Sequence, residues 1–64
     1  MDRAKMVRLK QVVRYTGLGR STIYKMVALG EFPKQAKISL RAVGWVEQEI
    51  IDWLKRRVED RDGI

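Results

Sequence analysis

The stretch from Gln11 to Leu29, QVVRYTGLGRSTIYKMVAL, restricts the fold of this chain more than any other part of the sequence. Apolar residues in and just before it fall at i, i+3 and i+4 in two groups, which is the spacing of one helix face. The groups are Leu9, Val12 and Val13, and then Ile23, Met26 and Val27. Between them, Gly17 tolerates the positive φ of a tight turn and Gly19 lies at an N-cap position. The pattern predicts a helix-turn-helix, with helices over about residues 10–16 and 20–29.

The second helix of this pair has a defined outer face. If Ile23 points inward, the helical rotation places Ser21 and Lys25 on the opposite side, with neighbouring residues on the flanks. Thr22 and Tyr24 lie on the flanks, and Arg20 precedes Ser21 in the first turn of the helix. Small, hydroxylated and cationic side chains near a helix N-terminus suit the DNA major groove, although an ordinary helix pair with a solvated face shows a similar pattern.

Charge is distributed unevenly along the chain. Residues 1–41 hold 10 Lys and Arg against 2 acids, a net charge of +8, whereas residues 42–64 hold 4 against 6, a net charge of −2. A basic region that coincides with a helix-turn-helix is typical of a protein that binds a polyanion. Double-stranded DNA is the first candidate, and RNA, an anionic membrane surface or a merely solubilising surface would give the same asymmetry.

Composition argues against catalysis. The 64 residues contain no cysteine and no histidine, so the commonest metal ligands and general bases are missing. We expect no enzyme activity, no metal and no cofactor. No apolar run is long enough to cross a membrane, and the start, MDRAKMVRLK, has no signal-peptide core, so we expect a cytoplasmic protein.

Residues 35–45, QAKISLRAVGW, change from helical spacing to strand character. We predict a two-stranded hairpin with its tip at Ser39 to Arg41, resting on the helices through Trp45. Lys37 and Arg41 line this projecting element, and arginine favours a narrow minor groove. A solvated turn residue is the alternative for Arg41. On the first helix, Lys10 and Arg14 are within reach of a phosphate backbone.

A third helix is predicted over about residues 46–58, since its apolar residues form an amphipathic stripe. The stripe consists of Val46, Ile50, Trp53, Leu54 and Val58. We expect Trp53 in the core, closing over the first two helices, and we expect frayed ends up to Met6 and from Glu59. The predicted fold is mostly α with a small β-hairpin: a winged helix-turn-helix of three helices and a two-stranded wing, forming one domain over residues 1–64.

Three short motifs occur in order along this fold: RSTIY at residues 20–24, G-x-F-P at 30–33 and RAVGW at 41–45. With this arrangement the chain closely resembles the AlpA family of prophage regulators over about residues 6–57. That family is similar to phage excisionases and to the DNA-binding head of mercury-resistance-type regulators. Gly19 is a departure, because many relatives have serine there.

The resemblance implies a winged helix-turn-helix that binds DNA near the integrase genes of phages or genomic islands. It places Arg20, Ser21, Thr22, Tyr24 and Lys25 on the recognition helix, and Lys37, Ser39 and Arg41 on the wing. Members act as transcriptional regulators, as excision factors that bend attachment-site DNA, or as both. Further copies on adjacent sites, an integrase and RNA polymerase are possible partners. The sequence leaves open whether Tyr24 contacts DNA or the core, and whether the chain is instead a basic protein-interaction module.

Overall fold

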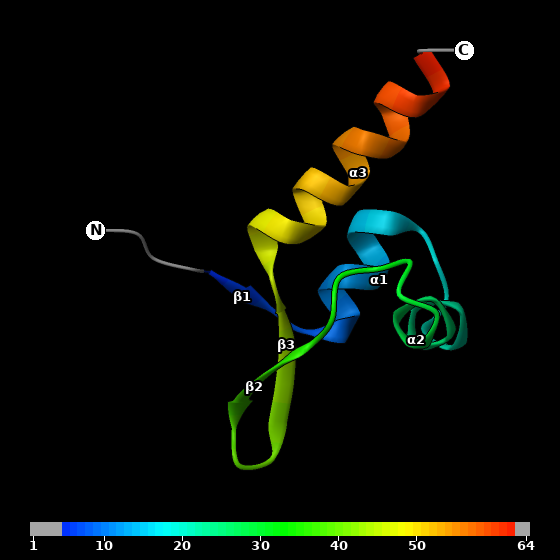
Figure 1. Cartoon of the computed structure of the whole chain (residues 1–64). Helices are drawn as coiled ribbons and strands as arrows, with labels where there is room; N and C mark the ends of the chain where they lie inside the picture. Colours follow the sequence, from blue (N-terminus) through cyan, green and yellow to red (C-terminus); the bar gives the residue numbers. More distant parts are fainter. Residues whose placement is uncertain (1–4, 63–64) are drawn as a thin grey trace.

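Residues 5–62 are described by the computed structural model, in which a short strand and two helices precede a hairpin and a third helix (Figure 1). The elements are β1 (Met6–Val7), α1 (Leu9–Thr16), α2 (Arg20–Ala28), β2 (Ala36–Ser39), β3 (Ala42–Val46) and α3 (Glu47–Asp62). Three helices and a small antiparallel sheet are thus present, as expected for a winged helix-turn-helix. None of these helices is both long and apolar enough to span a membrane.

The corner between α1 and α2 is stabilised by hydrogen bonds among neighbouring residues and by a glycine in the left-handed conformation. Gly17 has φ 75°, the left-handed conformation that costs glycine little, and its N–H donates to the Val13 carbonyl over 2.8 Å. The Thr16 hydroxyl donates to the Val12 carbonyl and accepts from the Leu18 N–H. Leu18 packs against the core from this corner. The short segment between the helices therefore has a set geometry, which fixes the direction in which α2 leaves α1.

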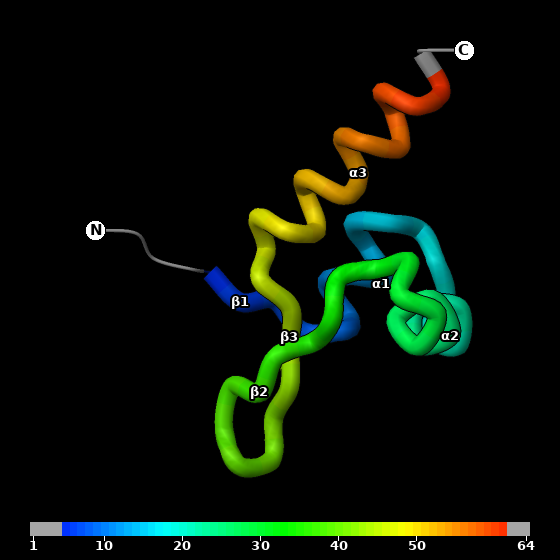
Figure 2. The backbone as a smooth tube through the Cα atoms, in the orientation of Figure 1, coloured from blue at the N-terminus to red at the C-terminus, as the bar shows by residue number. Residues whose placement is uncertain are grey.

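The expected two-stranded hairpin is confirmed, but the lead-in expected to be frayed up to Met6 is ordered at its end: Met6 and Val7 form β1, while residues 1–4 lie outside the described part of the chain. The sheet has three strands in the order β1-β3-β2, because β1 pairs antiparallel with the end of β3 (Figure 2). Met6 lies opposite Val46, and Val7 lies opposite Trp45 and is buried. Because β1 covers only this end of β3, the rest of the β2–β3 hairpin extends away from the body as the wing.

The turn of the hairpin consists of Leu40 and Arg41. Two-residue hairpin turns usually need positive φ to match the strand twist, but no non-glycine residue in the described part of the chain has one. The pairing shifts by one residue between Lys37 and Ser39, so β2 contains a bulge at Ile38. A bulge increases the local twist, which explains how a hairpin forms here without the expected turn residues.

The core takes a side chain from every element except β2. Its buried residues are Val7, Val12, Ile23, Phe32, Trp45 and Ile50. Phe32 belongs to the connector between α2 and β2, whereas all four residues of β2 are exposed. The hairpin thus rests on the body through Trp45 of β3, as expected.

The third helix differs from its expected bounds at both ends. Val46 belongs to β3 because it pairs with Met6, so α3 begins at Glu47. The stretch from Glu59, expected to be frayed, is helical up to Asp62, since no glycine or proline interrupts it. Trp53 is only partly buried and packs edge-on against Phe32, with 4.8 Å between ring centroids, so it lies beside the connector and not fully inside the core.

The start of α3 is tied to two distant segments through Glu47. Its carboxylate accepts a hydrogen bond from the Tyr15 hydroxyl of α1, and the Lys5 ammonium lies 3.9 Å away. Its backbone N–H donates to the Lys5 carbonyl. The hydrogen bond to Glu47 is the main cause that raises the pKa of Tyr15 above 10.0, because a phenolate would lose this bond and face a carboxylate.

Gly44 of β3 is enclosed by its neighbours. A Cβ atom at this position would lie 2.6 Å from the Val7 carbonyl oxygen and 2.6 Å from Cδ1 of Ile38. The first of these contacts is with backbone, which moves less readily than the end of a side chain. Glycine is therefore required where β1 crosses close to β3.

The first prediction follows from this contact. Gly44→Ala should lower the free energy of unfolding by about 1–3 kcal/mol, the usual cost of overpacking a well-filled site. Gly19→Ala is the matched control: a Cβ there meets nothing within 4 Å, and φ is −77°. We expect the control to cost less than about 1 kcal/mol, from the weaker N-cap alone. Urea unfolding followed by circular dichroism measures both, and equal losses would contradict the role given to Gly44.

The second prediction concerns alkaline pH. In Tyr24→Phe, Tyr15 is the sole tyrosine, and we expect its phenol to titrate above 10.0 by ultraviolet absorbance. Replacing Glu47 by Gln should bring the midpoint back towards 10.0, whereas Glu49→Gln should not. Because the folded pKa is raised, the stability from this contact is complete below pH 10.0 and is lost as pH rises through the folded value. An unshifted midpoint in the Tyr24→Phe protein would contradict this account.

Candidate nucleic-acid interface

The exposed side of α2 is set by the one residue that anchors the helix. Ile23 is fully buried, so the residues around it on the helix turn outward. All five predicted contact residues of this helix are exposed: Arg20, Ser21, Thr22, Tyr24 and Lys25. The structure thus presents hydroxyl groups and two cations on one short helix that starts at an uncharged, extended N-cap, Gly19.

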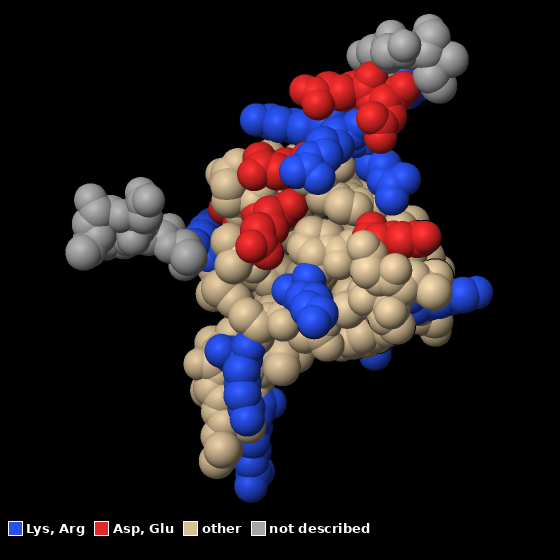
Figure 3. Space-filling model, in the orientation of Figure 1, with Lys and Arg blue, Asp and Glu red and all other residues tan. Residues whose placement is uncertain are grey.

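The hairpin carries the second group of predicted residues. Lys37 and Ser39 of β2 and Arg41 of the turn are all exposed. In Figure 3 the projecting hairpin shows basic side chains and no acidic ones, whereas the acidic side chains visible on this face gather mostly over α3. The wing is therefore a narrow cationic projection.

Two further predicted residues lie on α1. Lys10 and Arg14 are exposed and are four residues apart, which places them on the same side of the helix. The ten predicted contact residues thus come from three elements, and all ten are at the surface.

Within the described part of the chain, no ion pair neutralises these cations. Glu31 is the single acid between residues 5 and 46. Within the described residues the ion pair found is Lys5–Glu47, which involves none of the predicted contact residues. Arg20, Lys25 and Arg41 therefore keep their charge available for an external anion.

Tyr24 lies at the border between the core and the exposed surface of α2. Its ring is tilted by 51° against that of Trp45, with 6.2 Å between the centroids, and 41% of the residue is exposed. The ring therefore supports α2 against β3. Among residues 5–62 no partner is found for the hydroxyl group, so one face of Tyr24 contacts the core while its polar end is in solvent.

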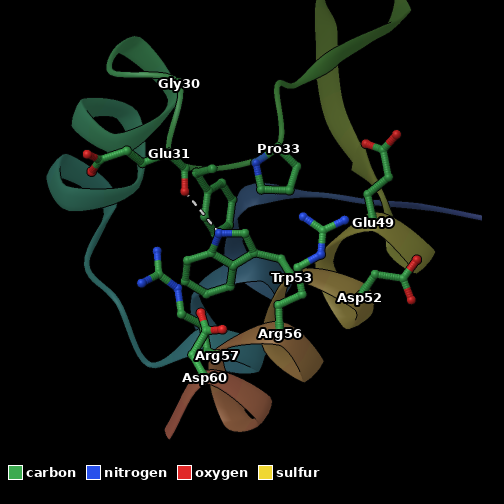
Figure 4. A pocket seen from close by; sticks show the side chains of 10 residues that line it. Gly30, Glu31, Pro33, Glu49, Asp52, Trp53, Arg56, Arg57 and Asp60 are labelled. Atoms are coloured by element: carbon green, nitrogen blue, oxygen red, sulfur yellow. Dashed lines mark hydrogen bonds between the residues drawn. The ribbon is translucent and has the colours of Figure 1, made fainter. Parts of the chain in front are cut away.

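The connector between α2 and β2 is held by two tryptophans. Nε1 of Trp45 donates to the Pro33 carbonyl and Nε1 of Trp53 donates to the Glu31 carbonyl, each over 2.9 Å. Figure 4 shows the second of these bonds, with Trp53 lying against the connector. Phe32, between the two acceptors, is buried. Together these contacts fix where α2 ends relative to β3 and α3, and the sequence pattern did not reveal either hydrogen bond.

A groove of about 570 Å³ lies between this connector and α3 (Figure 4). Trp53 lies in it, with the Arg57 guanidinium 4.5 Å from the ring centroid. Its charged lining residues are Glu31, Glu49, Asp52, Arg56, Arg57 and Asp60. Four carboxylates make this groove unsuited to DNA, and no cluster of potential metal ligands is found in the described part of the chain.

Fold and surface together define a winged helix-turn-helix protein with a cationic helix and wing. The chain belongs to the AlpA family: residues 5–58 match the family model described as Prophage CP4-57 regulatory protein (AlpA). The family resemblance inferred from the three motifs is thereby confirmed. Membership of a family of regulatory proteins also agrees with the expectation that the chain is not an enzyme.

Two relatives show how far the similarity extends. The chain is 36% identical over 59 residues to the DNA-binding transcriptional activator AlpA of Escherichia coli K12, covering 83% of this chain and 84% of that protein. It is 35% identical over 57 residues to the uncharacterized protein ORF88 of Enterobacteria phage P4, covering 89% of this chain. The chain spans 65% of the length of the phage protein. No solved structure matches the chain.

The third prediction separates the two roles of Tyr24. Tyr24→Phe keeps the ring beside Trp45, so thermal stability should stay within about 0.5 kcal/mol, the usual range for a surface change. Tyr24→Ala removes the ring contact and should cost about 0.5–1.5 kcal/mol more. If the hydroxyl holds a phosphate, Tyr24→Phe should nevertheless weaken DNA binding. Binding of Tyr24→Phe equal to that of the wild type would assign Tyr24 to the core alone.

Proposed function

We propose that this protein is a sequence-specific DNA-binding regulator of transcription in a prophage or genomic island, acting near an integrase gene. The observation that carries the proposal is the set of exposed cations on α2 and the wing that have no ion-pair partner within residues 5–62. The E. coli relative is named a DNA-binding transcriptional activator, which supports the same function for this chain.

In the proposed complex α2 lies in the major groove. Ser21, Thr22 and Lys25 contact base edges, and Arg20 joins them at the first turn of the helix. Lysine and arginine pair with guanine acceptors, and hydroxyl groups accept or donate according to the base. A helix of this length reads a short site, because the exposed residues span little more than one turn.

The remaining contacts position the protein. Lys10, Arg14 and Tyr24 hold phosphates beside the major groove, and Lys37 and Ser39 do so along the wing. Arg41, at the turn, enters the adjacent minor groove, whose negative potential attracts arginine. Phosphate contacts set register and orientation, while the base contacts of α2 set the site.

One such module buries little surface, so useful affinity requires several copies on adjacent sites. The acids of α3 keep that helix away from the duplex, which leaves it free for an integrase or RNA polymerase. A factor that promotes excision by bending attachment-site DNA would use the same contacts and is the second candidate. Either function places the protein in the cytoplasm, where the DNA is.

The fourth prediction tests the function directly. In a mobility shift with DNA flanking this gene and the nearest integrase gene, we expect a discrete ladder that resists scrambled competitor, with one step per bound copy. With about four to six phosphate contacts, log affinity should fall with log salt at a slope of roughly −4 to −5. A smear that either competitor removes equally would leave a general polyanion binder. No salt-sensitive binding at all would favour a protein-interaction module.

The fifth prediction tests the wing. Arg41→Ala should weaken binding to this DNA by about tenfold or more and reduce the salt slope by about one. Lys55→Ala, which removes an exposed cation from α3, is the matched control and should leave both quantities nearly unchanged. If Arg41→Ala binds like the wild type, the wing has no part in the mechanism.

A further inference from the structure

Leu40 is the most exposed of the large apolar residues in the described part of the chain, at 84%. It forms the two-residue turn of the wing together with Arg41, at the end of the hairpin opposite to the one where β1 pairs with β3. Single exposed leucines are common on protein surfaces and need no explanation by themselves. A leucine at the tip of a basic projection is a different case, because turns at hairpin tips usually contain polar residues or glycine.

The fold gives no reason for leucine at this position. The turn has no positive φ to satisfy, and the bulge at Ile38 supplies the twist. Leu40 is not among the side chains that pack on the core. We therefore expect a polar residue at this position to leave the hairpin equally well formed.

We propose that Leu40 inserts between base pairs from the minor groove and bends the bound DNA. This inference rests on the proposed function, and it adds deformation of the bound DNA to the binding proposed above. Apolar wedges of this kind partly unstack a base step and kink the duplex towards the major groove. The leucine side chain moves from water into the base stack, and the adjacent Arg41 contacts the phosphates that border the groove.

The shape of the wing agrees with this role. The turn is only two residues long, so Leu40 and Arg41 alone form the end of the projection that faces the minor groove in this proposal. At its other end the hairpin is anchored, since Trp45 is fully buried and bonded to Pro33, and β1 pairs with the same end of β3. A wedge needs such a firm base, because the force that opens a base step is borne by the body of the protein.

The surroundings of Leu40 favour DNA over a protein partner. Arg41 and Lys37 flank it without an ion-pair partner in residues 5–62, and no acid lies on the hairpin. Lysine is depleted at the centre of protein interfaces, whereas both cations suit a phosphate-lined groove.

The test measures bending separately from binding. A duplex selected by the wild-type protein from a random pool is placed in a circular-permutation set and also labelled with 2-aminopurine at successive steps. The variants are Leu40→Ala, the rescue variant Leu40→Ile and the matched control Leu29→Ala, which removes another exposed leucine, 61% exposed, at the end of α2. Circular dichroism melting establishes that each variant is folded.

We expect Leu40→Ala to lose at least about half of the bend and the 2-aminopurine signal at one step, while its affinity falls by less than about tenfold. Leu40→Ile should keep the bend, and Leu29→Ala should match the wild type throughout. If the wild-type complex is not bent, or if Leu40→Ala bends DNA as much as the wild type does, the wedge is refuted. The proposal that the protein binds DNA would still stand. Failure of the wild-type protein to select any duplex would instead refute the proposed function, and the wedge with it.

Discussion

Two indole N–H groups determine where the candidate recognition helix lies. Trp45 and Trp53 donate to the carbonyls on either side of Phe32, so the connector that follows α2 is bound to both β3 and α3. At its other end, α2 is fixed by the Gly17 corner, and between the two ends Ile23 is its single fully buried residue. A helix with so little buried surface would shift easily on the core. Its orientation therefore depends on how firmly its two ends are held.

The acids and the bases of this chain are separated in space as well as in sequence. The wing shows bases alone in Figure 3, and most acids visible on that face lie on α3. Because the basic elements have one acid between residues 5 and 46, their field is not cancelled locally. Under the proposed function, this separation favours the approach of a polyanion to α2 and the wing over its approach to the acidic residues of α3.

Much of the fold followed from local patterns. The i, i+3, i+4 spacing and Gly17 predicted the helix-turn-helix, because both act within a few residues, and the three motifs identified the family. The contacts that the sequence did not reveal join distant residues: β1 with β3, Tyr15 with Glu47, and Trp53 with Glu31. Surface exposure of the candidate residues of α2 followed from helix periodicity, but no local pattern distinguishes the fully buried Trp45 from the partly buried Trp53 or reveals that both donate hydrogen bonds to the connector.

The two strands of the wing differ in how much they contribute to the buried core. Every residue of β2 is exposed, so this strand adds nothing to the buried core, and a two-stranded ribbon is marginal in water. Its other strand, by contrast, contains the fully buried Trp45 and the enclosed Gly44. A small domain has little stability to spare, and a projecting strand that buries nothing orders residues without stabilising the fold. Under the proposed function such a strand serves contacts outside the molecule, made by Lys37 and Ser39 of β2 and by Leu40 and Arg41 of the turn.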